Sequence, residues 1–430
     1  MTWLRIVITL SFIAYLIYLS DFALAASIRP KTIKPVPKAE NFTLYIVIPV
    51  LNEEQVIGQT LLSLLAEIRK LPTNIAPWIV TVNDDSDDQS QAIITALQAD
   101  HPNILPFDRP PEEAHQGKGD VLNYAVNVIQ HLPNGNPDHT ILGILDADSK
   151  ISAADLTKVI DYFTAHPDIA MLQGSVKIYN DDHWLTRMQD FKFVGVNSAL
   201  QQVRETYDEG IASGNGQFVT LSMALANPWG KGLLEDTEFT LRAWLKGYKT
   251  AFSDDIVVAQ SGVDKMRPLI RQRVRWCQGS MQCWRYLPAL WRSKQINRFQ
   301  KFDTTLWLVL PVLSTLIPIT NIIALIIQVY NYLHGPAGWI SPALVVILLL
   351  SFAICMAIGL EYHENMAKIT PVSYHHALWL SVLYQAYLVL LIPVPYIALG
   401  RQILHMTKWD KTEHASAPET ASQSHIWPVK

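Results

Sequence analysis

The chain has 430 residues, which is enough for a large catalytic domain and a smaller unit. Half of the residues are hydrophobic and the mean hydropathy is +0.15, values that are high for a soluble protein, and the longest uncharged runs lie near the two ends. A formal net charge of −4 neither favours nor excludes nucleic-acid binding, and three cysteines without metal-ligand spacing (Cys277, Cys283 and Cys355) exclude a disulfide framework.

The first apolar run, residues 6–19, predicts a membrane segment. A cleaved signal peptide is one interpretation, because Ala23, Leu24 and Ala25 resemble a cleavage site. However, Arg5 alone precedes the run, whereas basic residues are frequent in residues 29–38 that follow it. The positive-inside rule therefore favours an uncleaved anchor, residues 1–26, with everything after it in the cytoplasm. The basic, proline-containing residues 27–42 predict a linker that leaves the membrane surface.

From residue 43 onward, apolar runs of strand length alternate with helical stripes. We expect strands at residues 43–48, 78–82, 104–107, 141–145 and 169–173, and helices around residues 57–68, 93–97, 121–129 and 156–163. Such alternation predicts an α/β domain with a mostly parallel sheet covered by helices on both faces. No GxGxxG motif follows the first strand, which argues against a dehydrogenase-type dinucleotide fold.

Two carboxylates, Asp146 and Asp148, appear at the carboxyl end of the expected strand at residues 141–145. Ligands of open parallel sheets bind outside the carboxyl ends of the strands. Hard oxygen ligands suit Mg²⁺ or Mn²⁺ when the bound molecule is a diphosphate. Taken alone, however, the two acids could equally form an ordinary turn before a helix.

Two later motifs have both a structural and a functional interpretation. Gly214 and Gly216 bracket Asn215, which suits close approach of the backbone to a ligand or an ordinary turn. Glu235 and Asp236 open a predicted helix, where acids are commonly partners of the helix dipole and nothing more.

Residues 264–303 combine basic and aromatic side chains, and long apolar runs follow. This composition predicts helices in the membrane interface, with nucleic-acid binding as the competing interpretation. Residues 304–333, 339–360 and 377–399 are each long enough to cross a membrane once. Three crossings would put the tail outside, whereas its basic residues prefer the cytoplasm, so one of these segments could be re-entrant or interfacial.

These motifs together resemble the membrane-integrated, inverting glycosyltransferases of family 2, the group of cellulose, hyaluronan, chitin and poly-N-acetylglucosamine synthases. Two departures are Asp85, where the family has glycine, and Leu234, where it has threonine. Six elements in the family's order carry the resemblance: Pro49, Asn52 and Glu53; Asn83, Asp84, Asp85, Ser86 and Asp88; Gly117, Lys118, Gly119 and Asn123; Asp146 and Asp148; Glu235 and Asp236; and Gln272, Arg273, Val274, Arg275 and Trp276.

The resemblance implies a cytoplasmic GT-A domain, which is Rossmann-like with a mostly parallel sheet, at residues 43–262. Basic amphipathic interface helices with the Q-x-x-R-W element would follow at residues 263–302. Transmembrane segments at 303–400 and a polar tail at 401–430 would complete a multi-pass protein of the cell membrane.

The resemblance also implies a role for each site residue. Asp236 would be the general base, and Asp148 with Asp146 would hold Mg²⁺ or Mn²⁺. The nucleotide sugar would contact Pro49, Glu53, Asp84 (through the uracil), Lys118, Asp146 and Arg275 (through the diphosphate). The acceptor would contact Gly214, Asn215, Glu235, Gln272 and Trp276.

The implied activity is a UDP-sugar-dependent β-glycosyltransferase that uses UDP-glucose or UDP-N-acetylglucosamine and processively elongates an extracellular polysaccharide. A diacylglycerol or another membrane lipid is the alternative acceptor, because the acceptor site would lie beside the membrane interface. A polymer conduit would call for a homo-oligomer or an accessory subunit, and no nucleic acid is expected as a partner. A secreted carbohydrate-binding protein with an inactive site is a third interpretation, which the intact acids disfavour.

Overall fold

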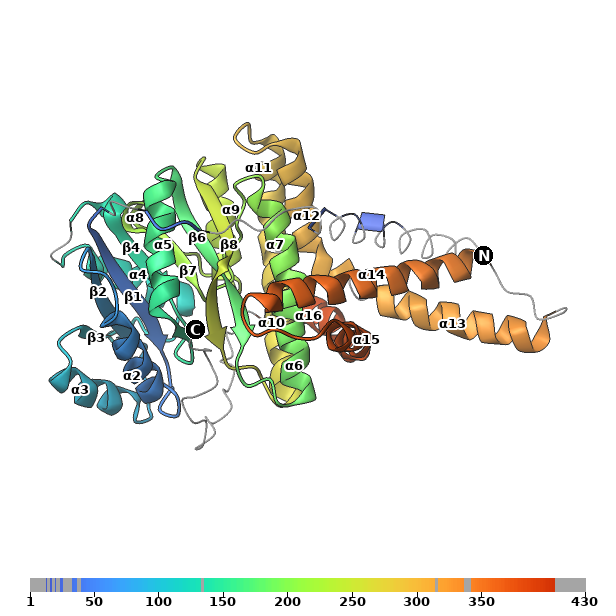
Figure 1. The fold of residues 1–430 in the computed structure, drawn as a ribbon, viewed down its shortest axis with the longest axis horizontal. Coiled ribbons are helices and arrows are strands. Elements are labelled where there is room, and N and C mark those ends of the chain that lie inside the picture. Colours follow the sequence, from blue (N-terminus) through green and yellow to red (C-terminus); the bar gives the residue numbers. More distant parts are fainter. Residues whose placement is uncertain are drawn as a thin grey trace.

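In the computed structural model, an α/β unit packs against a set of long helices, two of which extend away from it (Figure 1). The structure describes residues 40–132, 135–313, 316–335 and 342–406, with short pieces before residue 37. Most of the expected anchor at residues 1–26 and the tail after residue 406 lie outside the described residues.

The α/β unit is built on an eight-stranded sheet in the order β3-β2-β1-β4-β7-β6-β8-β5. Strands β3, β2, β1 and β4 are parallel, β7 is antiparallel to both of its neighbours, and β6 is parallel to β8. The prediction of a parallel-rich α/β fold is therefore confirmed. The strands are β1 (Phe42–Val50), β2 (Ile75–Asn83), β3 (Ile104–Asp108), β4 (Thr140–Ile144), β5 (Lys150–Ile151), β6 (Ile169–Ile178), β7 (Gln217–Thr220) and β8 (Lys249–Gln260).

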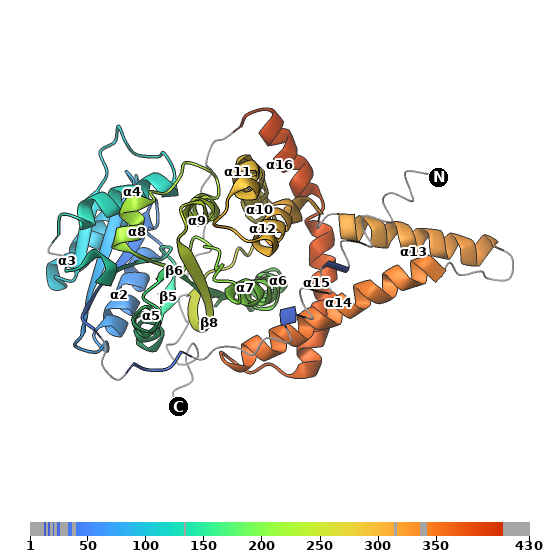
Figure 2. The ribbon, with the colours of Figure 1, turned by 90° about the horizontal axis from the view of Figure 1, so that it is seen from above.

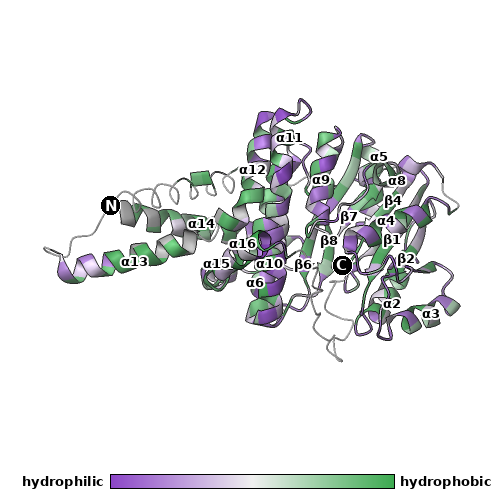
Figure 3. Ribbon diagram, turned by 180° about the vertical axis from the view of Figure 1, so that it is seen from behind, coloured by the Kyte–Doolittle hydropathy of each residue, from purple (hydrophilic) through white to green (hydrophobic). Residues whose placement is uncertain are grey.

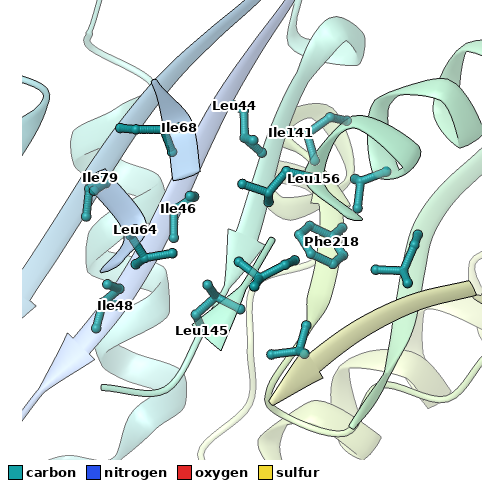
Figure 4. Packing of buried hydrophobic residues seen from close by; sticks show 14 of the residues in the cluster. Leu44, Ile46, Ile48, Leu64, Ile68, Ile79, Ile141, Leu145, Leu156 and Phe218 are labelled. Carbon is teal, nitrogen blue, oxygen red and sulfur yellow. The ribbon is translucent and has the colours of Figure 1, made fainter. Parts of the chain in front are cut away.

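Strand β1 has side chains buried on both faces of the sheet. Leu44, Ile46 and Ile48 pack in one core and Tyr45 and Val47 in another, because alternate residues of a strand point to opposite faces. Figure 4 shows the first core, in which leucines and isoleucines of β1, α2 and α5 interlock. The helices of this unit are α2 (Ile57–Ile68), α3 (Ser90–Asp100), α4 (Lys118–Ile129), the short η1 (Pro137–His139), α5 (Ala153–Ala165), α8 (Leu221–Ala226) and α9 (Glu235–Leu245).

A middle layer of helices lies between the sheet and the protruding helices (Figure 2). One part of it is a continuous run in which the π-helix η2 joins two α-helices, and the other part follows β8 in the chain. Its elements are α6 (Trp184–Asp190), η2 (Phe191–Asn197), α7 (Ser198–Glu205), α10 (Met266–Cys283), η3 (Trp284–Tyr286), α11 (Leu287–Arg292) and α12 (Arg298–Leu313).

The last four helices are α13 (Leu316–His334), α14 (Pro342–Ala367), α15 (Tyr374–Leu390) and α16 (Pro393–Ile403). The expected run at residues 304–333 is divided between the end of α12 and α13, the run at 339–360 lies mostly in α14, and the run at 377–399 is divided between α15 and α16. Helices α13 and α14 project from the rest and carry many hydrophobic residues (Figures 2 and 3). Among the helices described, one stretch, Tyr374–Ile403, is long and apolar enough to cross a membrane. The other expected crossings remain predictions.

Candidate active site

A cavity of about 450 Å³ opens where β1, β2 and β4 end. It brings together predicted site residues that are up to 227 positions apart in the sequence (Pro49 and Trp276). Asn215 is the one predicted site residue that does not line it. The predicted residues that do are Pro49, Glu53, Asp84, Lys118, Asp146, Asp148, Gly214, Glu235, Asp236, Gln272, Arg275 and Trp276.

The loops after β1 and β2 are hydrogen-bonded to each other. The Asn52 nitrogen donates to Ser86 Oγ at 2.9 Å, and the Asp87 nitrogen donates to Asn52 Oδ1 at 2.9 Å. Asn52 and Asp85 have left-handed backbones, with φ of 53° and 61°. That conformation favours glycine but is tolerated by Asn and Asp, which accounts for Asp85 at the position where the family has glycine.

These loops place Asp84 in the cavity wall. Its Oδ1 accepts a hydrogen bond from Arg109 at 2.5 Å, and its Oδ2 accepts one from the His115 nitrogen at 3.2 Å. Both side chains of the Asp84–Arg109 ion pair are buried. Arg109 follows β3 directly, and no motif in the sequence pointed to it. The pair fixes the direction of the Asp84 carboxylate.

Lys118 forms the next part of the wall, at the start of α4. Its Nζ donates to Asp146 Oδ1 at 2.5 Å and to the Gly214 carbonyl oxygen at 2.7 Å. Burial acts to lower the pKa of Lys118, but the Asp146, Glu235 and Asp236 carboxylates outweigh it and hold the pKa above its usual value. The lysine is therefore a fixed positive charge at the centre of an acidic group.

Asp146 and Asp148 leave β4 toward the cavity, as the strand-end argument predicted. Asp148 is buried, and its Oδ2 accepts a hydrogen bond from the Ser261 nitrogen at 2.9 Å, just after β8. No group of three or more His, Cys, Asp or Glu side chains forms a ready-made metal site within the described residues. Mg²⁺ is commonly held by one or two carboxylates together with substrate phosphates, so this oxygen donor set fits such a cation.

Asn215 has a different position from the one that its acceptor role required. It is 1% exposed, and its Oδ1 accepts hydrogen bonds from the Asp146 nitrogen at 3.3 Å and from Ser149 Oγ at 2.9 Å. Its Nδ2 donates to Gln260 Oε1 at 2.6 Å. Because these bonds occupy both ends of the amide, Asn215 orients the Asp146 loop from behind and is not exposed to the cavity.

Glu235 and Asp236 begin α9 and face the cavity. Burial, and then the adjacent charge of Glu235, raise the pKa of Asp236 to about 7. The Thr237 nitrogen donates a hydrogen bond to Asp236 Oδ1 at 2.6 Å, which acts to lower this pKa. Burial also raises the pKa of Glu235, although Lys118 and Arg275 act to lower it. A carboxyl group with a pKa close to neutral pH is suited to proton transfer.

Gly214 closes the cavity beside Asp236. Its φ is +76°, and a Cβ at this position would lie 3.1 Å from Asp236 Oδ2. A glycine is therefore needed here both for the backbone conformation and for the space around the carboxylate.

Helix α10 supplies the remaining wall through Gln272, Arg275 and Trp276, which follow the helical i, i+3, i+4 spacing. Trp276 packs edge-on against Phe193 of η2, with ring centroids 6.2 Å apart. The cavity continues past Trp276 to side chains of α12, α14, α15 and α16, an extension that the sequence motifs did not indicate. These side chains are Trp307, Pro311, Ser351, Ile354, Ile358, Tyr384, Gln385, Leu388, Leu391, Val394 and Pro395.

The parallel-rich sheet with a carboxylate-lined cavity at its strand ends has a mixed α/β, GT-A-like fold. Residues 141–399 match the family model described as glycosyl transferase family group 2, and residues 45–224 match that of glycosyl transferase family 2. The chain belongs to glycosyl transferase family group 2, and the prediction of a glycosyltransferase is confirmed. The polysaccharide-synthase subgroup stays a prediction.

Two curated proteins are similar to part of the chain. A beta-monoglucosyldiacylglycerol synthase of Synechocystis is 30% identical over 255 residues, covering 56% of this chain and 50% of that protein. The probable glycosyltransferase YdaM of Bacillus subtilis is 24% identical over 255 residues, covering 58% of this chain and 57% of that protein. The chain therefore spans about half the length of the curated relatives that it matches.

One solved structure shares the fold over most of the chain. It is the mannosyltransferase PcManGT from Pyrobaculum calidifontis, solved in complex with GDP-Man and Mn²⁺, with a TM-score of 0.53 and 15% sequence identity. The comparison covers 94% of this chain and 99% of that one, so the similarity includes helices beyond the α/β unit.

Proposed function

We propose that the protein is a membrane-bound, inverting glycosyltransferase that transfers a sugar from a UDP-sugar to a hydroxyl group of a membrane lipid. The observation that carries this proposal is the two-part cavity. Asp84, Lys118, Asp146 and Asp148 line one end, and the other end is lined mainly by apolar side chains of the C-terminal helices. A polar donor site that is continuous with an aliphatic chamber suits an acceptor with a polar head and hydrocarbon chains.

The similarity to a beta-monoglucosyldiacylglycerol synthase supports a lipid acceptor. The predicted organisation supports it as well, with an anchor at residues 1–26, a GT-A domain at 43–262, interface helices at 263–302 and crossings within 303–400. In this arrangement the catalytic domain is cytoplasmic, where UDP-sugars are available, and the apolar end of the cavity lies at membrane level.

Asp236 is the proposed general base. Its carboxylate accepts the proton of the attacking hydroxyl, and its raised pKa of about 7 keeps it basic enough to do so. Attack from the face opposite the leaving group inverts the anomeric carbon, so an α-linked donor yields a β-linked product. Gly214 leaves room for the base, because a Cβ at this position would lie 3.1 Å from Asp236 Oδ2.

Positively charged side chains in the wall of the cavity are proposed to receive the leaving group. Arg275 and Lys118 line the cavity, and Lys118 is already held by Asp146. Their cationic groups form charge-assisted hydrogen bonds with a departing diphosphate. Asp148 with Asp146 would hold Mg²⁺ or Mn²⁺, which stabilises negative charge on the diphosphate as a Lewis acid.

A processive polysaccharide synthase is the second candidate. It is favoured by the complete Q-x-x-R-W element, whose Trp276 lies in the cavity wall. In that case a second copy of the chain or an accessory subunit would help to form the conduit.

Membranes that contain the full chain, incubated with labelled UDP-glucose, UDP-N-acetylglucosamine or GDP-mannose, separate the two candidates. A lipid acceptor predicts label that extracts into chloroform and methanol, from wild-type membranes and not from Asp236→Asn membranes. Label that stays in an insoluble polymer, with none in the organic phase, would refute the lipid acceptor. The three donors also test the choice of nucleotide.

A further inference from the structure

Arg273 is a buried cation in the wall of the cavity. It is 4% exposed, and none of its three guanidinium nitrogens has a hydrogen-bond partner among the residues that the structure describes. The Cζ atom lies 4.1 Å from the centroid of the Trp276 ring and 5.9 Å from that of Phe193. Buried arginines are normally hydrogen-bonded, because an unsatisfied buried charge is costly.

Lys192 brings a second cation to the same place. Its Nζ lies 5.6 Å from the Trp276 centroid, and its side chain also lines the cavity. Burial, and then the charge of Arg273, lower the pKa of Lys192 well below its usual value. Burial and the charge of Arg273 thus both disfavour the protonated form of Lys192, and a bound anion would favour it.

The backbone that carries Lys192 is itself unusual. Lys192 and Phe193 belong to the seven-residue π-helix η2 between α6 and α7. π-Helical turns are rare and are frequent at functional sites. Here the π-helix directs one cation and one aromatic ring toward the Trp276 side of α10.

The donor end of the cavity has different cations. Arg275 lies two residues beyond Arg273, and helix residues with this spacing do not face each other. Burial raises the pKa of Glu235, and the nearby charge of Arg275 acts against that rise, whereas Arg273 contacts Phe193 and Trp276. Arg275 and Lys118 therefore belong to the donor end, and Arg273 and Lys192 to the side where the acceptor would enter.

We propose that Lys192 and Arg273 form a phosphate-binding subsite beside Trp276, which takes the phosphate group of a membrane lipid whose chains occupy the apolar end of the cavity. This inference rests on the proposed lipid acceptor and specifies the acceptor further, as a phospholipid. A phosphate supplies the acceptors that the guanidinium nitrogens lack, and the planar donor fork of arginine matches its oxygens. Its negative charge also favours the protonated form of Lys192.

The test measures binding to the purified full chain in detergent. The probes are dioctanoyl-phosphatidylglycerol, dioctanoylglycerol, inorganic phosphate, and UDP with Mn²⁺. We expect the wild type to prefer the phospholipid over the neutral lipid by about tenfold or more, as one charge-assisted contact would give. Arg273→Gln and Lys192→Gln should each remove this preference and leave UDP affinity unchanged.

Two further variants make the test specific. Arg292→Gln removes an exposed cation of α11 and should keep the preference for the phospholipid. Arg273→Lys keeps the positive charge and should retain part of the preference for the phospholipid. If Arg273→Gln does not fold, Lys192→Gln, which changes a less buried side chain, decides the question.

Several results would overturn the subsite. The wild type could bind the two lipids equally, or the Gln variants of Arg273 and Lys192 could lose UDP affinity. Arg292→Gln could reduce the phospholipid preference as much as those variants do, or inorganic phosphate could bind as tightly as the phospholipid. The labelling experiment distinguishes this failure from failure of the proposed function. Label in lipid without phospholipid preference refutes only the subsite, whereas phospholipid preference with label only in polymer refutes the lipid acceptor and, with it, the role of the subsite in holding an acceptor.

Discussion

Replacing Asp236 by asparagine tests the assignment of the base. The amide has nearly the shape of the carboxylate but cannot accept the proton of the attacking hydroxyl. General-base catalysis is typically worth about a hundredfold to ten-thousandfold, and we expect a loss of that size in kcat. UDP affinity should be nearly unchanged, because the proposed donor contacts come from Asp84, Lys118 and Arg275.

The same substitution should stabilise the fold at alkaline pH. Because burial and Glu235 raise the pKa of Asp236 from 3.8 to about 7, the unfolded chain releases this proton first. The protonated Asp236 carboxyl therefore makes its full contribution to the free energy of unfolding below about pH 4. This contribution is lost as the pH rises to about 7. At about 1.4 kcal/mol per pH unit the loss approaches about 4 kcal/mol, an upper limit because Glu235 titrates with Asp236.

Two assays check these effects. Wild-type kcat should rise as the pH passes through about 7, since only the ionised carboxylate is a base, whereas Asp236→Asn should show no such rise. Thermal unfolding in detergent, without donor or metal, should show the variant gaining on the wild type as the pH rises from about 4 to about 7. Substantial transfer by the variant, loss of its UDP binding, or an unfolding difference independent of pH would each refute the reasoning.

Three other substitutions test further parts of the site. Asp148→Ala should weaken Mn²⁺-dependent UDP binding by about a hundredfold in calorimetry, because it removes the central metal ligand, whereas binding without metal should change little. Gly214→Ala should lower kcat by about tenfold to a hundredfold in initial-rate assays, because the added Cβ lies 3.1 Å from Asp236 Oδ2; an unchanged kcat would contradict this contact. Arg204→Met should destabilise the protein by about 3–5 kcal/mol in denaturant titrations, because it leaves the buried Asp303 partner of a bidentate ion pair unpaired.

The first half of the fold was predictable because its signals are local. The run at β1 is apolar without alternation, as expected for a strand buried on both faces, and the acids that follow β2 and β4 mark the sheet edge where ligands bind. Strand β8 was missed because it contains Asp254 and Asp255, which pair with Lys368 and Lys158 and look like a loop in the sequence.

The direction of a side chain was harder to predict than its location. Asn215 lies next to the cavity but points away from it. Its direction depends on hydrogen bonds with Asp146, Ser149 and Gln260, which are far from Asn215 in the sequence and belong to no common motif. Helix α10 was expected as an interface helix from its basic composition. Yet Arg273 is buried, and only tertiary packing shows which of its basic residues turn inward.

The contacts between the catalytic unit and the C-terminal helices explain how a lipid hydroxyl could be aligned with a base. Arg204 of α7 binds Asp303 of α12, Tyr362 of α14 donates to Asp190 Oδ2 at 2.8 Å, and Asn365 donates to the Val194 carbonyl at 2.9 Å. These buried bonds join the helices that line the apolar end of the cavity to the α6–η2–α7 run beside Trp276. If the acceptor is the proposed lipid, its hydrocarbon chains give little orientation of their own, and we expect the polar bonds between the helices to set the distance from the chains to the base. A change that loosens these bonds should therefore lower kcat for a lipid acceptor more than it lowers donor binding.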